Sequence, residues 1–112
     1  MEAHEIDDVL ARRAASGRAY LEFVRHPQMS IGLYVLPARG VDPQSPHTED
    51  EAYYVIEGRG RVTVGDDTRD VGPGSLVYVP ARVRHRFHDI TDELSILVVF
   101  APAEYSAAEG AA

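Results

Sequence analysis

Glycine and proline interrupt the apolar residues of this chain every few positions, and this spacing restricts the folds it can adopt. Three tight-turn signals follow one another, at Gly58-Arg59-Gly60, Gly65-Asp66-Asp67 and Gly72-Pro73-Gly74. The second is a hairpin signal. In the third, Pro73 presets φ and Gly74 is free to take positive φ. Many short apolar segments between such turns indicate an antiparallel β sandwich or barrel.

The segments between the turns have the composition of strands. Arg61 to Val64 alternates polar and apolar residues, whereas Leu94 to Phe100 is almost continuously apolar. We expect a mainly β protein with strands over 19–25, 29–36, 52–57, 61–64, 76–79, 83–87 and 94–100.

A helix is expected before the first strand. Ile6, Val9 and Leu10 have the spacing of one helix face, which predicts a short amphipathic helix from residue 4 to about 15, stopped at Ser16-Gly17. A helix this short must pack against the rest of the chain to be stable. We therefore expect a helical segment at 1–18, a β barrel at 19–102 and a flexible, alanine-rich acidic tail at 103–112.

Composition excludes several classes of partner. At 112 residues the chain is long enough for one domain. Its net charge of −7 argues against nucleic acid and anionic membrane surfaces as partners. No apolar run approaches the roughly 20 residues that span a bilayer, and the acidic N-terminus lacks a signal-peptide pattern. Without cysteine there are no disulfides or thiolate metal sites. We expect a cytoplasmic protein.

Two histidine-containing stretches point toward the interior of the predicted barrel. Side chains of a strand alternate between its faces. If 45–55 is extended, one face carries Ser45, His47, Glu49, Glu51, Tyr53 and Val55. Val55 is apolar and Tyr53 mostly so, which makes that face the inner one.

The same alternation applies around His85. It shares a face with Val83 and Phe87, while the other face carries Arg82, Arg84 and Arg86. The arginines favour solvent, so His85 is expected to point inward. His88 is expected to point outward unless a bulge intervenes.

Two imidazoles and a carboxylate form a donor set that suits a divalent transition metal. An inward carboxylate without a partner costs several kcal/mol, so Glu51 requires a metal, an arginine or a wet cavity. Glu49 lies on the same face and is either an additional ligand or a solvated loop acid. We expect Tyr53 and Phe87 to form the aromatic wall of a cavity.

These stretches resemble the two motifs of the cupin superfamily, in particular its small single-domain members. The first motif reads Gly, five residues, His-x-His, three or four residues, Glu, six residues, Gly. Glu51 and Gly58 match its second half, and His47 takes the place of its second histidine. The second motif is matched by Gly74, Pro80 and His85. The resemblance covers about residues 30 to 100.

The chain departs from the family pattern at three positions. Ser45 stands at the place of the first histidine, Arg82 at that of a glycine and Asp89 at that of an asparagine. The resemblance implies an antiparallel double-stranded β-helix, or jelly-roll, barrel. Carried over residue by residue, it implies that Fe, Mn, Ni or Zn is bound by a reduced ligand set, His47, Glu51 and His85. Such a set leaves coordination positions open for water and substrate.

Two functions follow, and the sequence leaves both open. The first is a metal-dependent enzyme of the dioxygenase or isomerase type that acts on a small organic substrate. The second is a non-catalytic barrel that binds or senses a small molecule, with the metal as an anchor or absent. Exposed edge strands need covering, and the resemblance implies a homodimer. Its interface is expected at the first two strands or the N-terminal helix.

Overall fold

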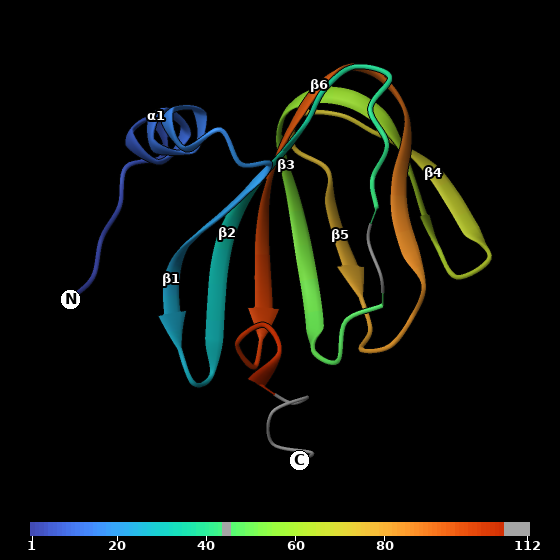
Figure 1. The fold of residues 1–112 in the computed structure, drawn as a ribbon. Coiled ribbons are helices and arrows are strands. Elements are labelled where there is room, and N and C mark those ends of the chain that lie inside the picture. Colours follow the sequence, from blue (N-terminus) through green and yellow to red (C-terminus); the bar gives the residue numbers. More distant parts are fainter. Residues whose placement is uncertain (44–45, 107–112) are drawn as a thin grey trace.

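Antiparallel pairing joins six strands into one strongly curled sheet (Figure 1). The computed structural model describes residues 1–43 and 46–106. The sheet order is β1-β2-β6-β3-β4, and β5 pairs with β3. In chain order the elements are α1 (Ile6–Ser16), β1 (Tyr20–His26), β2 (Met29–Leu36), β3 (Asp50–Val64), β4 (Asp67–Val71), β5 (Leu76–Val79) and β6 (His85–Ala101). The predicted mainly β class with one N-terminal helix is confirmed.

Two long strands, β3 and β6, form the centre of the sheet. Each is continuous where the sequence predicted two separate strands, and they pair from Asp50↔Ala101 to Val64↔His85. The predicted break at Gly58 is wrong: the residue has φ +95° and lies where the pairing register shifts. These irregularities are β-bulges, which bend a strand and increase its twist without ending it. They allow the two strands to curl over the barrel interior.

The sequence did not predict β4. Four of its five residues are exposed and polar, so it lacks an alternating apolar pattern. It follows the hairpin signal and pairs with the second half of β3 at an edge of the sheet. Its place therefore depends on the turn rather than on burial.

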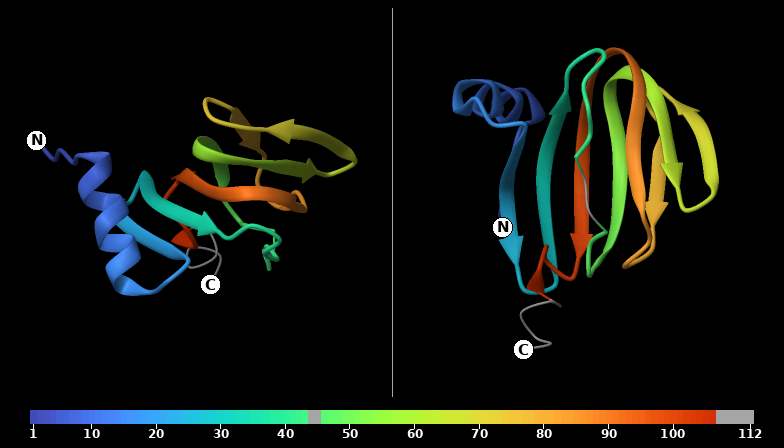
Figure 2. Two further views of the ribbon diagram at one scale, coloured as in Figure 1. Left: turned by 90° about the horizontal axis from the view of Figure 1, so that it is seen from above. Right: turned by 45° about the vertical axis from the view of Figure 1, so that its right-hand side comes forward.

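The helix covers the outer face of the first strands. It ends at Gly17, which has φ +70° and whose N–H bonds the carbonyl of Ala14. Val9 packs with Leu33 and Val35 of β2, and Figure 2 shows α1 lying alongside β1 and β2. Within the described ranges, no helix is long and apolar enough to cross a membrane.

The barrel interior is filled by the opposite faces of the same strands. Tyr34 and Leu36 point inward from β2, while their neighbours Leu33 and Val35 meet the helix. The interior cluster is completed by side chains from the other strands: Tyr53, Val55, Val62, Val71, Val79, Phe87, Ile90, Leu94, Ile96, Val98 and Phe100.

Residues 103–106, here called the C-terminal turn, lie within the segment predicted as a flexible tail. They are held against the β1–β2 hairpin. Ala103 is buried and its N–H bonds the carbonyl of Pro27 at 3.3 Å. The N–H of Glu104 donates to Ser30 Oγ at 2.9 Å. The alanine-rich acidic composition of this segment gave no sign of these contacts, because they use mostly backbone groups.

Candidate metal centre

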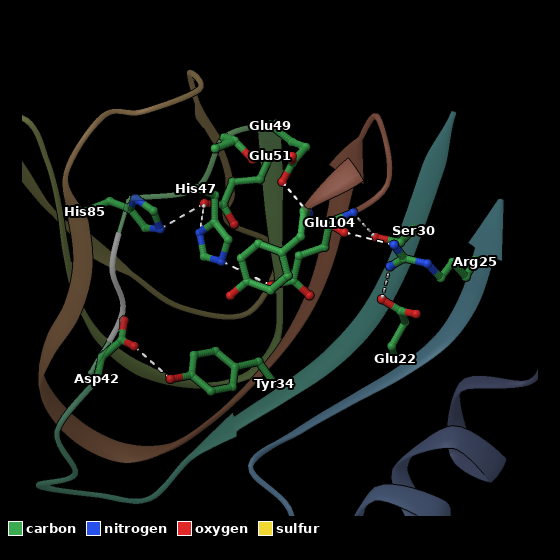
Figure 3. Close-up of polar contacts among 12 residues, drawn as sticks. Glu22, Arg25, Ser30, Tyr34, Asp42, His47, Glu49, Glu51, His85 and Glu104 are labelled. Carbon is green, nitrogen blue, oxygen red and sulfur yellow. Dashed lines mark hydrogen bonds and ion pairs between the residues drawn. The ribbon is translucent and has the colours of Figure 1, made fainter. Parts of the chain in front are cut away.

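Three donor side chains meet inside the barrel (Figure 3). His47 Nδ1 lies 3.3 Å from Glu51 Oε1, and His85 Nε2 lies 2.8 Å from the same oxygen. Each residue offers one ligand atom, and these atoms all lie within 4.8 Å of one another. The Glu51 and His85 side chains are each 1% exposed, and that of His47 is 11% exposed. The structure thus brings together the three residues that the motifs indicated.

The curl of the sheet makes this meeting possible. Glu51 lies at one end of the β3–β6 ladder, and His85 lies at the other, opposite Val64. In a flat sheet these ends would be roughly 40 Å apart. Two contacts join the loops that precede the strands: the N–H of Arg82 donates to the His47 carbonyl at 2.6 Å, and the N–H of Ala81 donates to Asp50 Oδ1 at 2.8 Å.

Two of the three motif departures preserve the backbone conformation of the pattern. Arg82 has φ +67° and Asp89 has φ +49°. This left-handed region is readily adopted by glycine and is tolerated by asparagine and aspartate. At Arg82 the backbone adopts this left-handed conformation although the residue carries a side chain. The third departure, Ser45, lies outside the described residues.

The orientation of the second stretch is as the strand alternation predicted. His85 and Phe87 are buried, whereas Arg82, Arg84 and Arg86 are exposed. His88 is half-buried and directed elsewhere, with Nε2 2.6 Å from Thr63 Oγ1 and Nδ1 2.9 Å from Asp89 Oδ2.

The remaining ring nitrogen of each ligand histidine contacts an acceptor. His85 Nδ1–H donates to the carbonyl of Val83 at 2.8 Å, so its Nε2 faces Glu51. His47 Nε2–H donates to Glu104 Oε2 at 3.2 Å, so its Nδ1 faces Glu51. Metal-bound histidines in proteins almost always donate their other N–H to a carbonyl, a carboxylate or water. Both imidazoles therefore direct their second nitrogen toward the same carboxylate, as an N–H that donates to it when the ring is protonated and as a lone pair available to a metal when the ring is neutral.

The donor atoms fit a metal ion. His47 Nδ1 and both carboxylate oxygens of Glu51 are buried, and none has an aligned hydrogen-bond partner among the described residues. Leaving buried polar atoms without aligned partners is costly. A divalent cation between the three side chains would satisfy them together, and nitrogen and carboxylate oxygen are suitable donors.

The three side chains shift one another's protonation. Burial acts to raise the pKa of Glu51, but its contacts with His47 and His85 outweigh burial and lower the pKa to about 2. Burial acts to lower the pKa of His47, but Glu104 and Glu51 raise it to about 9. The pKa of His85 is also raised, because the bonds to Glu51 and the Val83 carbonyl outweigh burial. Metal binding must displace the histidine protons, so it competes with them.

A cavity of about 330 Å³ opens beside His47 and Glu51, while His85 is not among its lining residues. This is at the small end of ligand pockets in proteins, about 300–1,000 Å³. Tyr53 lines it as predicted, while Phe87 is not among the lining residues and packs edge-on against the Tyr53 ring, with centroids 4.9 Å apart. The lining residues are Tyr20, Tyr34, Pro43, His47, Glu51, Tyr53, Val98, Phe100, Glu104 and Tyr105.

Glu49 has a different environment from either of the two that the sequence suggested. It is 1% exposed, so it is not a solvated loop acid. The group of converging donor atoms does not include it. Its carboxylate instead accepts the N–H of Tyr105 at 2.7 Å and the hydroxyl of Thr48. It therefore anchors the C-terminal turn.

Several residues of the site were missed by sequence reasoning. Glu104 and Tyr105 come from the C-terminal turn, and the Tyr105 ring stacks on His47 with centroids 5.7 Å apart. Asp42 is buried and accepts the Tyr34 hydroxyl at 2.7 Å and the N–H of Phe87 at 2.8 Å. No motif spacing includes these residues. For Glu104 and Tyr105, the only available signal was a glutamate next to a tyrosine in an alanine-rich segment.

Comparisons with known proteins agree with this architecture. A family model described as "Cupin domain" matches residues 32–101. The chain is 51% identical over 104 residues to an uncharacterized protein of Streptomyces coelicolor, covering 93% of this chain and 99% of that protein. A crystal structure from Thermus thermophilus aligns with TM-score 0.75 and 25% identity, covering 92% of this chain and 99% of that one. An RmlC-like cupin family protein from Methanocaldococcus jannaschii, with a double-stranded β-helix fold, aligns with TM-score 0.70 and 25% identity, covering 81% and 84%.

Proposed function

The chain belongs to the cupin domain family, and from that premise we propose that it binds one divalent transition metal through His47, Glu51 and His85. The proposal rests on the burial and the contacts of the Glu51 carboxylate. Both its oxygens are buried, one of them lies within ion-pair distance of both imidazoles, and each imidazole has its other N–H already engaged. Iron, manganese, nickel and zinc all accept this donor set.

We propose a small organic molecule as the ligand of the cavity. A bound metal with three protein ligands would supply open positions that polarise a carbonyl or hold an acidic oxygen. The chain supplies the rest: aromatic walls from Tyr34, Tyr53 and Phe100 enclose the molecule and exclude water. These features support a metal-dependent enzyme of the dioxygenase or isomerase type. The cysteine-free composition supports a cytoplasmic location.

Tyr20 is the residue that would orient such a ligand. Its hydroxyl is buried and has no aligned partner among the described residues. Burial, together with nearby carboxylates, raises its pKa, so the phenol stays protonated and can donate to an oxygen of the ligand. The ring lies where a side chain at position 32 would be, because a Cβ on Gly32 would come within 2.1 Å of the Tyr20 hydroxyl.

A non-catalytic binding or sensing barrel is the second candidate. Apart from tyrosines, the ionisable residues that line the cavity are His47, Glu51 and Glu104. Two of these are proposed ligands and the third bonds to His47, which favours binding without acid–base chemistry. A catalyst would lose turnover when the metal is removed by a chelator, whereas a binder in which the metal is dispensable would keep its ligand affinity.

Elemental analysis of protein purified from cells grown without added zinc tests the metal proposal. We expect about one equivalent of a transition metal per chain, and its loss in His85→Ala. His88→Ala is the matched control, since His88 lies three residues further along β6 but contacts Thr63 and Asp89. Wild-type protein without metal, or equal metal in the wild type and His85→Ala, would contradict the proposal.

A further inference from the structure

We propose that Glu104 is a positioning residue for the metal centre, which fixes the His47 ring so that Nδ1 faces Glu51 and His85. The inference rests on the proposed metal function. It concerns a residue that lies outside both motifs and outside the family match at 32–101.

His47 depends on side-chain contacts for its orientation. It lies in the loop before β3 rather than in a strand. Its ring packs against those of Phe100 and Tyr105, with centroids 4.8 and 5.7 Å away. Ring packing alone does not fix the orientation of the imidazole, because half a turn about the Cβ–Cγ bond exchanges each nitrogen with a carbon and preserves the shape of the ring. The bond to Glu104 does fix it, since the carboxylate accepts from Nε2–H and has no such donor in the turned ring.

Glu104 is itself held in place, as a positioning residue must be (Figure 3). Its N–H donates to Ser30 Oγ at 2.9 Å, and Ser30 is fully buried. Its carbonyl accepts from Arg25 Nη2 at 3.1 Å, and Arg25 pairs with Glu22 at the same distance. The backbone of Glu104 is thus tied to both strands of the β1–β2 hairpin, and its side chain reaches His47 from there.

The neighbouring residue gives the C-terminal turn a second attachment to the site. The N–H of Tyr105 donates to the buried carboxylate of Glu49 at 2.7 Å. Glu49 lies two residues from both His47 and Glu51 in the chain. The turn is therefore joined to the ligand-bearing loop through a side-chain bond, a backbone bond and a ring stack, which together restrict the position of Glu104.

Zinc affinity, measured by competition with a chromophoric chelator at one fixed pH, tests the inference. Loss of an outer partner of a metal-bound histidine typically weakens metal binding 10- to 100-fold. We expect a loss of this size in Glu104→Ala and in Glu104→Met, which keeps the bulk of the side chain. Glu104→Gln should lose less, because its amide oxygen still accepts from Nε2–H. Glu93→Gln removes the charge of an exposed β6 residue that is outside the network holding Glu104, and it should match the wild type.

A spectroscopic readout separates positioning from a general loss of structure. In zinc-loaded wild type, ¹⁵N–¹H spectra should show His47 with Nδ1 bound to zinc and Nε2 protonated. In Glu104→Met, a second form bound through Nε2 should appear. Wild-type affinity in both Glu104→Ala and Glu104→Met would overturn the role of Glu104 and leave the proposed metal function standing. A wild type that binds no zinc, iron, manganese or nickel would overturn both.

Discussion

A single oxygen of Glu51 lies close to both imidazoles, which makes this carboxylate the centre of the site. Its charge offsets the two histidines when they are protonated and would offset a cation when they are not. The same three side chains can therefore form an ion cluster without metal or hold a metal ion, and in the absence of metal the pH sets whether the ion cluster forms.

The stability of metal-free protein should depend on this cluster. The pKa of Glu51 is lowered from 4.5 to about 2, so its contribution is present above pH 4.5 and is lost as pH falls toward 2. The pKa of His47 is raised from 6.5 to about 9, so its contribution is present below pH 6.5 and is lost as pH rises through 9. From these two groups we expect maximal stability between about pH 4.5 and 6.5.

Urea unfolding of chelator-treated protein at a series of pH values measures this dependence. The unfolding midpoint should fall between pH 6.5 and 9, and His47→Gln should reduce the fall. A midpoint that stays constant or rises over this range in the wild type would contradict the assignment.

Strand alternation placed His47, Glu49, Glu51 and His85 inward and the neighbouring arginines outward. The resemblance to the cupin motifs was needed to choose His47, Glu51 and His85 from these as the proposed ligands. Alternation could not reveal Glu104, which contacts His47 across 57 positions of the chain. That contact depends on where the β1–β2 hairpin holds the C-terminal turn, and no local pattern records it. Glu49 was misjudged for the same reason, since its partner, Tyr105, lies in that turn.

At the scale of elements, Gly58 was read incorrectly as the end of a strand, whereas Gly74 was read correctly as part of a turn. Gly58 and Gly74 have almost the same φ, +95° and +91°. They differ in their surroundings: a Cβ on Gly58 would lie 2.1 Å from the carbonyl oxygen of Glu93, whereas nothing lies within 4 Å of one on Gly74. The first sits within two paired long strands and the second in an open turn.

Alanine substitution at these two glycines should separate backbone strain from crowding. Both variants incur the cost of a left-handed residue, about 1 kcal/mol or somewhat more. Gly58→Ala must in addition push the backbone of β6 away, so we expect it to lower the free energy of unfolding by at least about 2 kcal/mol more than Gly74→Ala does. Denaturant unfolding measures both. Equal losses would show that the β3–β6 contact at Gly58 tolerates a methyl group.

At the scale of the whole molecule, the family and the fold class could be predicted from two motifs and the turn spacing. The continuity of β3 and β6 could not, because a bulge and a strand end have similar sequence signals. The curl that follows from this continuity brings the two ends of one ladder together around the site.

Homodimer formation remains a prediction at this scale. Strand β1 ends the sheet and has a neighbouring strand on one side only, and a free strand edge favours pairing with another chain. We expect sedimentation equilibrium to give twice the 12.3 kDa chain mass, with the contact at β1, β2 or α1. A species of 12.3 kDa throughout the micromolar range would contradict this prediction.

The bond between His47 and Glu104 has a consequence for proteolytic trimming. A chain cut before residue 104 would keep both histidines and Glu51 but lose the carboxylate that contacts His47. If Glu104 has the proposed role, removal of the last few residues would weaken metal retention without removing a ligand.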